Sequence, residues 1–369
     1  DGYIYREPLG VVAGACPFNF PAMIPMWMFP VAIACGNTFI LKPSDKCPMT
    51  GALVAGIMHD GGVPDGVLSV VHGGGDVVQQ LIAHPQVEAI SFVGSTPVAE
   101  IVWRSAAAAG KRVQALGGAK NYIVVMPDAD IEETAAAVIG STYGCAGERC
   151  MASSVLVPVA GGDEIVDRVI ELAKSLKLGD GMAADTGMGP VITAQHKRRV
   201  ESYIQIGVDE GATLRLDGRQ AQAEGLANGL ADGLAAGFFV GPTVFDHVTP
   251  SMRIAQEEIF GPVLSVMRAA SLDEAIAFAN ATPFGNGNSI FTASGGAARK
   301  FRNEIECGMI GINAGVPAPM AFFSFGGHKR SIFGDLRVHG PDGIEFYTRK
   351  KAVIERWPDT GPTGSVWGK

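Results

Sequence analysis

The residue best suited to nucleophilic chemistry is Cys150, in the segment Gly-Cys-Ala-Gly-Glu-Arg-Cys-Met-Ala that spans 144–152. Small residues let a loop approach a ligand closely, and a cation such as Arg149 beside a thiol lowers the pKa of that thiol. The pattern is therefore typical of an activated cysteine nucleophile. The alternative is a buried, inert cysteine, which composition alone favours. Cys145 lacks the adjacent cation and is assigned to the inert class.

A second candidate is Asn19, whose amide lies in the apolar, proline-bounded sequence Pro-Phe-Asn-Phe-Pro of 17–21. Burying an amide costs free energy unless the amide is hydrogen-bonded, so a polar residue in this setting indicates a role. One role is donation to a developing oxyanion. The other is to fix the loop, and the residues alone favour neither.

Several residues at predicted strand ends are suited to binding a nucleotide. Gly94-Ser95-Thr96 joins a strand to a helix, where Ser95 or Thr96 can cap the helix and its free N–H groups can bind a phosphate. Lys42 and Asp45 follow another strand and could bind a ribose, although an ordinary polar loop is favoured there. A GxGxxG fingerprint is absent after the first strand. Glu257 and Glu258 are interpreted as a salt-bridged surface pair.

Two other chemistries find no support in the sequence. The seven histidines show no metal-ligand spacing and form no cluster with cysteine, so no metal site is predicted. A GxSxG elbow is also absent, which argues against a serine hydrolase.

The elements that must position these residues alternate between short apolar strands and helices. Strands are expected at 10–14, 38–43, 67–71 and 89–93, and helices at 22–34, 50–59, 76–83 and from 94–96 to Ala109. Strands that are apolar on both faces and separated by helices indicate a parallel sheet covered on both sides. The loops at the carboxyl ends of its strands then meet at one edge, at 16–19, 42–45, 72–75 and 94–96.

A second α/β unit is expected after Gly117-Gly118. Its predicted elements are a strand at 122–126, a helix from near Asp130, a strand at 155–157, a helix at 164–176 and an extended run at 238–245. A short Gly-Leu-Ala repeat at 225–236 is interpreted as a surface loop insert. The sequence 344–347 is strand-like, and the end of the chain, with Pro358, Gly361 and Pro362, is expected to be mobile.

Length and composition agree with a large two-domain globular protein. The chain has 369 residues, 47% of them hydrophobic, and a net charge of -8, which argues against a nucleic-acid partner. Residues 8–41 carry no charge, but repeated prolines argue against a membrane span, and no signal peptide is recognised. Six sparse cysteines without a CxxC pair indicate reduced thiols and a cytoplasmic location.

Taken together, these motifs resemble the aldehyde dehydrogenase superfamily over nearly the whole chain and in the family's order. The matching stretches are 17–21 (PFNFP), 41–44 (LKPS), 92–96 (FVGST), 116–118 (LGG), 147–152 (GERCMA), 237–244 (GFFVGPTV) and 257–262 (EEIFGP). The resemblance implies two Rossmann-like, doubly wound parallel-sheet domains. The NAD-binding domain would span 1–118 and the catalytic domain 119–321. A return segment with a small oligomerisation strand and a mobile tail would occupy 322–369.

Within the superfamily, the chain is most similar to the CoA-acylating, methylmalonate-semialdehyde dehydrogenase branch. Hydrolytic members carry Glu before Leu-Gly-Gly as the base for water, whereas this chain has Ala115. They usually carry Lys after the Trp that follows the Asn loop, whereas Trp27 is followed by Met28. The stretches 113–121 and 146–152 also look like signatures of this branch.

The resemblance implies a role for each candidate residue. Cys150 would attack the aldehyde, Asn19 and the Cys150 N–H would hold the oxyanion, and hydride would pass to NAD. The CoA thiol would then release the acyl group, with loss of CO2 or bicarbonate, and Arg149 would bind the substrate carboxylate. The implied NAD contacts are Cys16, Phe18, Lys42, Asp45, Lys46, Ser95, Gly117 and Glu258. A carboxylate at position 45 favours NAD over NADP.

One departure from the family concerns the start of the chain. Family members carry a substantial segment upstream of Tyr5-Arg6-Glu7-Pro8, including part of the cofactor domain, so the NAD-binding domain is expected to be incomplete. A transit peptide could be missing too, which leaves a mitochondrial matrix location open. Homo-oligomers, dimers or tetramers, are implied, with 344–351 matching the oligomerisation strand. Two alternatives stay open: a hydrolytic dehydrogenase that yields a free acid, and a catalytically silent, nucleotide-binding chain.

Overall fold

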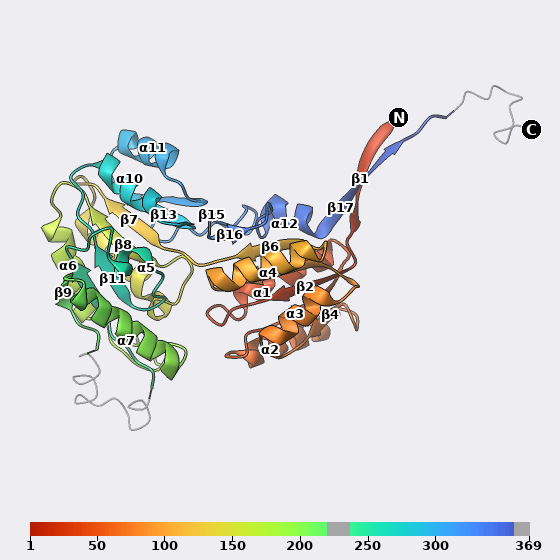
Figure 1. Ribbon diagram of the computed structural model, residues 1–369, viewed down its shortest axis with the longest axis horizontal. Coiled ribbons are helices and arrows are strands. Elements are labelled where there is room, and N and C mark those ends of the chain that lie inside the picture. The colour runs from red at the N-terminus through yellow and green to blue at the C-terminus, as the bar shows by residue number, and fades with distance from the viewer. Residues whose placement is uncertain (220–236, 358–369) are drawn as a thin grey trace, which may run out of the picture.

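The computed structural model describes residues 1–219 and 237–357. It shows two α/β lobes side by side, each built on its own β-sheet, and a thin β-ribbon that projects from one of them (Figure 1). The predicted α/β class with parallel-sheet domains is confirmed. The predicted domain boundary at residue 118 stays a prediction. It lies between strands β6 and β7, which belong to different sheets.

The first lobe is built on a sheet that has six strands within the described ranges, in the order β16-β6-β5-β2-β3-β4. Five strands run parallel and β16 is antiparallel. The strands are β2 (Val11–Ala15), β3 (Thr38–Lys42), β4 (Leu68–Val70), β5 (Val87–Val93), β6 (Arg112–Leu116) and β16 (Ile332–Phe333). The helices are α1 (Met23–Ala34), α2 (Pro48–Asp60), α3 (Gly75–Ala83), α4 (Thr96–Ala108) and α12 (Gly340–Tyr347).

The apolar pattern predicted strands β2 to β5 and helices α1 to α4 to within a few residues. Strand β6 was not predicted. Its sequence Arg-Val-Gln-Ala-Leu mixes polar and apolar residues, yet Gln114 is only 1% exposed because its side chain donates to the Ser91 hydroxyl inside the lobe. A buried, hydrogen-bonded polar side chain therefore stands where a buried strand usually has an apolar residue.

The second lobe is built on a sheet that has seven strands in the part of the chain that the structure describes, in the order β14-β13-β7-β8-β11-β10-β9. The strands are β7 (Asn121–Val125), β8 (Ser153–Pro158), β9 (Thr213–Leu216), β10 (Thr243–Asp246), β11 (Val263–Val266), β13 (Gly287–Phe291) and β14 (Met309–Ile312). The helices are α5 (Ile131–Tyr143), α6 (Asp163–Lys174), α7 (Ala194–Asp209), α9 (Arg253–Gln256), α10 (Leu272–Ala281) and α11 (Gly295–Glu304). A 3-10 turn, η1 (Gly144–Gly147), follows α5.

Local sequence explains where several of these helices begin. The side chains of Asp130, Thr193, Ser271 and Ser294 each accept a hydrogen bond from the backbone N–H three residues later. Such caps satisfy donors that a helix leaves free in its first turn. The expected helix start near Asp130 is confirmed.

The prediction of a strand at 344–347 was wrong. These residues end helix α12, and Phe346 and Tyr347 are each 1% exposed in a core cluster with Phe29 and Phe39. Aromatic and β-branched residues favour strands, but this packing overrides that preference. The last strand is β17 (Thr348–Ile354), which pairs antiparallel with β1 (Gly2–Pro8). The extended run predicted at 238–245 contains a strand only from Thr243.

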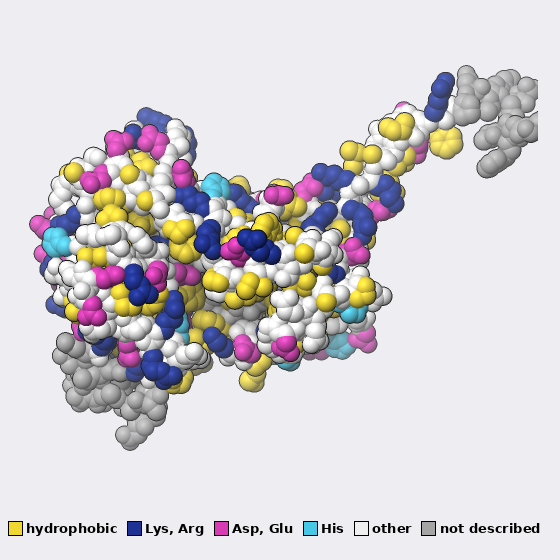
Figure 2. Space-filling model, viewed as in Figure 1, with side chains coloured by type: hydrophobic (Ala, Val, Ile, Leu, Met, Phe, Trp, Pro, Cys, Tyr) yellow, Lys and Arg dark blue, Asp and Glu magenta, His cyan; other side chains and the backbone are white. Residues whose placement is uncertain are grey.

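The β1–β17 ribbon stands away from both lobes (Figure 1). Lys and Arg side chains gather where it leaves the body (Figure 2), among them Arg6, Arg349, Lys350 and Lys351. Its large apolar side chains are exposed, with Ile4 at 66% and Ile354 at 85%. An isolated two-stranded ribbon is marginally stable in water, so this surface is suited to pairing with another chain.

The remaining sequence predictions concern the Gly-Leu-Ala repeat, the end of the chain and a possible membrane span. The Gly-Leu-Ala repeat at 225–236 and the end of the chain from 358 lie outside the described residues. Among the helices that the structure describes, none is long and apolar enough to cross a membrane. The uncharged segment 8–41 instead forms β2, α1 and most of β3.

Candidate active site

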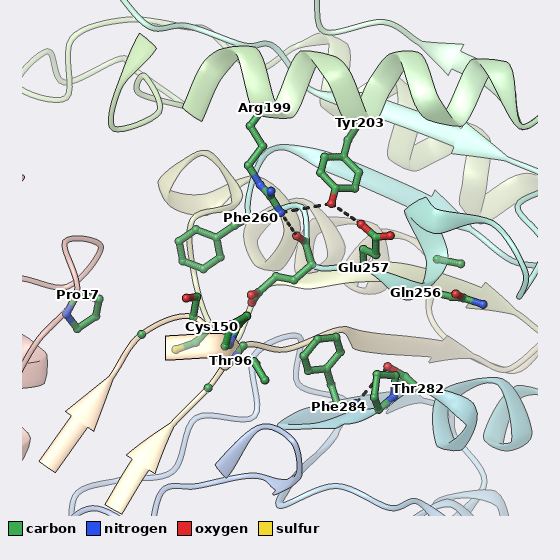
Figure 3. Close-up of a pocket in the computed structure, with 18 of the residues that line it drawn as sticks. Pro17, Thr96, Cys150, Arg199, Tyr203, Gln256, Glu257, Phe260, Thr282 and Phe284 are labelled. Carbon is green, nitrogen blue, oxygen red and sulfur yellow. Dashed lines mark hydrogen bonds between the residues drawn. The ribbon is translucent and has the colours of Figure 1, made fainter. Parts of the chain in front are cut away.

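A cavity of about 850 Å³ lies between the two lobes and gathers most of the chemistry-bearing residues (Figure 3). The first lobe contributes the loops that follow β2, β5 and β6, because the carboxyl ends of parallel strands meet at one edge of a sheet. The second lobe contributes Cys150, helix α7 and the loop after α9. Lining residues used below are Phe18, Asn19, Ser95, Thr96, Gly117, Gly118, Cys150, His196, Arg199, Tyr203, Glu257, Glu258 and Phe260.

Cys150 lies in the connection between η1 and β8, and its backbone is held by two amides. The side-chain Nδ2 atoms of Asn121 and Asn286 each donate to the Cys150 carbonyl oxygen at 2.9 Å. Asn121 begins β7 and Asn286 directly precedes β13, so the central sheet of the second lobe fixes the position of Cys150. The preceding turn is strained, because Cys145 and Ala146 both adopt a left-handed φ of 52°.

The neighbouring Arg149 lowers the pKa of the Cys150 thiol, as expected, but burial outweighs this effect. Burial, aided by the carboxylate of Glu258, raises the pKa of Cys150 to about 12, against weaker opposing effects of backbone N–H groups and Arg149. Charge proximity in the sequence did not reveal that the thiol is half-buried against the apolar core of the first lobe. A thiolate at this position would need a bound cation or a fixed donor to stabilise it.

Arg149 is not among the described residues that line the cavity. Its guanidinium donates to the Gly140 carbonyl oxygen at 3.2 Å, beyond the strained turn. Its buried Nε has no hydrogen-bond partner among the described residues. The structure therefore does not bring Arg149 to the thiol side of the cavity, but it leaves this cation with unused donor capacity.

Asn19 lines the cavity and also anchors its loop. Its Nδ2 donates to the Glu148 carbonyl oxygen at 2.9 Å, two residues before the nucleophile. An amide nitrogen carries two N–H groups, so this contact leaves a second donor for a ligand. Asn19 can therefore fix its loop with one N–H and still donate the other to an oxyanion.

Other predicted cofactor residues fall into two groups. Phe18 lines the cavity and meets Phe260 edge to face, with ring centroids 6.0 Å apart, while the Lys46 ammonium lies 4.8 Å from the Phe18 ring centre. Lys42 is buried at the end of β3, and Asp45 is exposed in the loop that follows. Cys16 is buried behind the loop, with its thiol on the Met28 sulfur. Neither Cys16, Lys42, Asp45 nor Lys46 is among the described lining residues.

The start of helix α4 differs from the predicted cap. In the described structure neither Ser95 nor Thr96 caps the helix, because the Thr96 hydroxyl instead accepts from the Gly118 N–H at 2.7 Å. The first N–H groups of α4 are thus left for a ligand at the cavity wall, which suits a phosphate. Gly117 has no room for a side chain, since an added Cβ would lie 2.8 Å from the Arg330 carbonyl oxygen.

The two adjacent glutamates have different environments. Glu257 fits the predicted surface pair, because it forms an ion pair with Arg253 at 2.8 Å. Glu258 does not: its side chain enters the cavity, where its Oε1 accepts from the Ala119 N–H at 2.9 Å. A Cβ on Gly118 would lie 2.2 Å from its Oε2. Burial raises the pKa of Glu258 to about 7, opposed by the Ala119 N–H, Lys120 and Arg199.

Sequence reasoning missed the contribution of helix α7. His196, Arg199 and Tyr203 all line the cavity, and Figure 3 shows Arg199 and Tyr203 projecting from this helix toward Phe260 and Glu257. The His196 Nε2 lies 2.7 Å from the Phe260 carbonyl oxygen and 3.4 Å from the Glu148 carboxylate. The run His-Lys-Arg-Arg at 196–199 was an available signal, since basic residues near an anion site are informative.

In residues 1–219 and 237–357, no three His, Cys, Asp or Glu side chains gather in a way that would hold a metal ion. The six cysteines, all of which lie in the described ranges, are free thiols.

Comparison with known proteins then defines the family. The model of the aldehyde dehydrogenase family matches residues 1–353. The chain is 54% identical over 358 residues to malonate-semialdehyde dehydrogenase 1 of Geobacillus thermodenitrificans, covering 96% of this chain and 72% of that protein. This chain belongs to the aldehyde dehydrogenase family, as the motifs predicted.

Two solved structures extend the comparison. The crystal structure of methylmalonate-semialdehyde dehydrogenase from Oceanimonas doudoroffii superposes with a TM-score of 0.94 at 48% identity, covering 98% of this chain and 72% of that one. The Mycobacterium tuberculosis aldehyde dehydrogenase complexed with NAD+ superposes with a TM-score of 0.89 at 33% identity, covering 96% and 71%. The fold is therefore that of an aldehyde dehydrogenase, and the chain spans about 72% of the length of these relatives.

Proposed function

We propose that this enzyme oxidises malonate or methylmalonate semialdehyde with NAD and passes the acyl group to CoA. The products are acetyl-CoA or propionyl-CoA, with the substrate carboxyl lost as CO2 or bicarbonate. The observation that carries the proposal is a cavity holding Cys150, Asn19 and Glu258, together with a fully buried Ala115 where hydrolytic members carry their base. Relatives named for malonate and methylmalonate semialdehyde support the substrate class.

The chemistry starts at the Cys150 sulfur, which adds to the aldehyde carbon. The resulting oxyanion is held by the second N–H of Asn19 and by the backbone N–H of Cys150. Bound NAD supplies the hydride acceptor, and its cationic ring favours the thiolate in a site that otherwise raises the pKa of the thiol. Loss of hydride leaves a thioester on Cys150, in which the nucleophile has replaced the aldehyde hydrogen.

The second half of the reaction depends on what attacks the thioester. Ala115 is 0% exposed and packs into the core cluster of the first lobe with Ala13 and Phe92, so no carboxylate acts from that position. A thiol has less need of such a base, because, unlike water, it is partly ionised at neutral pH and its thiolate is intrinsically nucleophilic. While the acyl group is on Cys150, the bond between its α-carbon and the carboxylate breaks, CO2 leaves and the α-carbon takes up a proton. The CoA thiolate then attacks the thioester carbonyl and displaces Cys150, which leaves as its thiolate.

The residues present fit NAD. The free N–H groups of α4 beside Ser95 suit the pyrophosphate, and the Glu258 carboxylate suits the hydroxyls of the nicotinamide ribose. Gly117 and Gly118 keep the cavity floor open between them. Lys42, Asp45 and Lys46 would hold the adenine ribose, where the Asp45 carboxylate disfavours a 2′-phosphate. Cys16 supports the loop from which Phe18 faces the nicotinamide.

Arg149 remains the proposed ligand of the substrate carboxylate. The support is its buried Nε, which has no partner among the described residues, and its long hydrogen bond to Gly140. A carboxylate offers two oxygens that match the guanidinium fork and would satisfy it better. The proposal requires the guanidinium to turn away from Gly140.

We also infer that the active assembly is a homo-oligomer, a dimer or a tetramer. The support is the β1–β17 ribbon, whose exposed apolar side chains need a covering partner to be stable. A measurement of molar mass in solution tests this inference. Truncation of the ribbon should give monomers.

The alternative is a hydrolytic dehydrogenase that yields a free acid. The observation that favours it is the Glu258 carboxylate, a cavity group with a pKa near 7 that could accept a proton from water. The deciding experiment is NADH formation from malonate semialdehyde and NAD, with and without CoA. Turnover that depends on CoA and yields acetyl-CoA supports the proposal, and equal turnover without CoA supports hydrolysis. No turnover, from a chain that melts cooperatively and binds NAD, favours the silent alternative.

A further inference from the structure

Lys120 is a buried cation for which the reaction described above has no role. It is 2% exposed and lies just before β7, in the Gly-Gly-Ala-Lys-Asn stretch of 117–121. Its ammonium donates to the Ile254 carbonyl oxygen at 2.7 Å and to the Glu257 carbonyl oxygen at 3.0 Å. Both carbonyls belong to α9 and the loop that delivers Glu258 to the cavity.

The loop at Glu258 is therefore held from several sides. The Ala119 N–H donates to the Glu258 Oε1 at 2.9 Å, and the Arg199 guanidinium on α7 donates to the Glu258 carbonyl oxygen at 3.1 Å. The Ser265 hydroxyl on β11 donates to the same Ile254 carbonyl as Lys120, at 3.2 Å. Lys120 thus shares its structural task with a neutral donor.

If the only task at this position were to donate hydrogen bonds to the Ile254 and Glu257 carbonyl oxygens, a neutral donor could perform it. Burying an ammonium is costly, and burial lowers the pKa of Lys120 to about 8, with Glu258 and then Glu257 acting against the change. Below pH 8 the site nevertheless holds a cation behind Glu258. The charged or titratable groups that act on Glu258 are Lys120, Arg199 and the Cys150 thiol. The neighbouring Glu257 instead pairs with Arg253.

We propose that Lys120 is a positioning residue whose charge keeps the Glu258 carboxylate ionised and directed at the ribose of bound NAD. The inference rests on the proposed function, in which Glu258 contacts that ribose. An ionised carboxylate accepts hydrogen bonds from both ribose hydroxyls, whereas a protonated carboxyl uses part of its capacity as a donor. Without the cation, Glu258 would take up a proton at a higher pH and lose this function near neutrality.

The test is the NAD dissociation constant, measured from pH 6 to pH 9 by calorimetry, for the wild type and four variants. Lys120→Met and Lys120→Gln remove the charge, and the glutamine keeps a donor for the carbonyls if the methionine variant does not fold. Ser265→Ala is the matched control, since it removes a neutral donor from the same Ile254 carbonyl. Glu258→Gln removes the titrating group. Thermal melting establishes that each variant is folded.

For the wild type, NAD affinity should weaken as the pH falls through about 7, because Glu258 becomes protonated. Removal of the Lys120 charge should move this midpoint upward by about one pH unit and weaken binding roughly fivefold at pH 7, with near-normal binding at pH 9. Ser265→Ala should leave the midpoint unchanged. Glu258→Gln should bind NAD weakly and without this pH dependence.

Other results would overturn the inference or the function on which it rests. If the Lys120 variants bind NAD equally poorly at every pH, Lys120 is only a structural donor. The same conclusion follows if Ser265→Ala moves the midpoint as far. Persistence of the pH dependence in Glu258→Gln would show that another group titrates. Failure of the wild type to bind NAD at any pH would instead contradict the proposed function.

Discussion

Two regions face the same cavity but are held in different ways. One is the nucleophile turn, residues 145–151, and the other is the cavity floor, formed by Gly117–Lys120 with Glu258. Neutral contacts fix the nucleophile: two amides on the Cys150 carbonyl and one from Asn19 to Glu148. Charged groups hold the floor, because Lys120 and Arg199 donate hydrogen bonds to backbone carbonyl oxygens of the loop that carries Glu258. In the proposed mechanism, the thiol would therefore gain its reactivity from the bound ligands, whereas the protein itself sets the pKa of the Glu258 carboxylate.

The largest expected effect is at the nucleophile. Cys150→Ala should lower NADH production by about 10⁴-fold or more, because no thioester can form. NAD affinity should change less than about twofold, since charges on the floor, and not the thiol, govern binding. Steady-state assays and calorimetry measure the two quantities. Retained turnover in Cys150→Ala would show that another residue is the nucleophile. Cys145→Ala is the matched control, and its turnover should be close to that of the wild type.

The next effect concerns the oxyanion. Asn19→Ala should lower kcat by about 10²–10³-fold, the usual loss when one oxyanion donor is removed. The loop contact to Glu148 is lost as well, so Asn19→Asp serves as a comparison of similar shape. If the melting temperature falls while kcat stays within about threefold, Asn19 only fixes its loop.

The floor should respond to pH in its stability. The pKa of Glu258 is raised by burial from 4.5 to about 7, so its protonation stabilises the folded state. That contribution is fully present below about pH 4.5 and is lost as the pH rises through 7. Glu258→Gln should therefore be more stable than the wild type by about 3 kcal/mol at pH 8 and by less than about 1 kcal/mol at pH 5. Denaturant titrations at both values check this, and equal differences at both would refute it.

The smallest effect should come from one of the amides that hold the nucleophile. Asn286→Ala removes one of the donors to the Cys150 carbonyl and should cost about 1 kcal/mol of stability. Because the contact is neutral, the pH profile of turnover should keep its shape. A changed profile would show that the nucleophile turn is tuned by charge after all.

The sequence predicted the parts of the fold that depend on regular apolar patterns. The strands and helices up to residue 109 lie close to where the pattern puts them, and the motifs identified the family. It failed where tertiary contacts override local preference, as in α12, where Phe346 and Tyr347 are buried. It also missed β6, whose buried Gln114 interrupts the apolar pattern.

The site was predictable where a residue type itself indicates its chemistry, as for Cys150 and Asn19. Their roles and those of the cofactor residues stay proposals. Solvent exposure could not be predicted, because it depends on residues distant in sequence. Adjacent charges suggested an acidic thiol, whereas burial raises its pKa. Likewise, nothing in the sequence separated Glu258, which enters the cavity, from Glu257, which pairs with Arg253.

The central claim is that the thioester on Cys150 is attacked by the CoA thiol and not by water. The most direct test mixes the enzyme with NAD and malonate semialdehyde without CoA and follows the intact mass of the protein. The account predicts an acyl adduct that peptide mapping assigns to Cys150, that persists without CoA and that disappears when CoA is added, with formation of acetyl-CoA. An adduct that hydrolyses to the free acid as fast without CoA, or one on another residue, would contradict it.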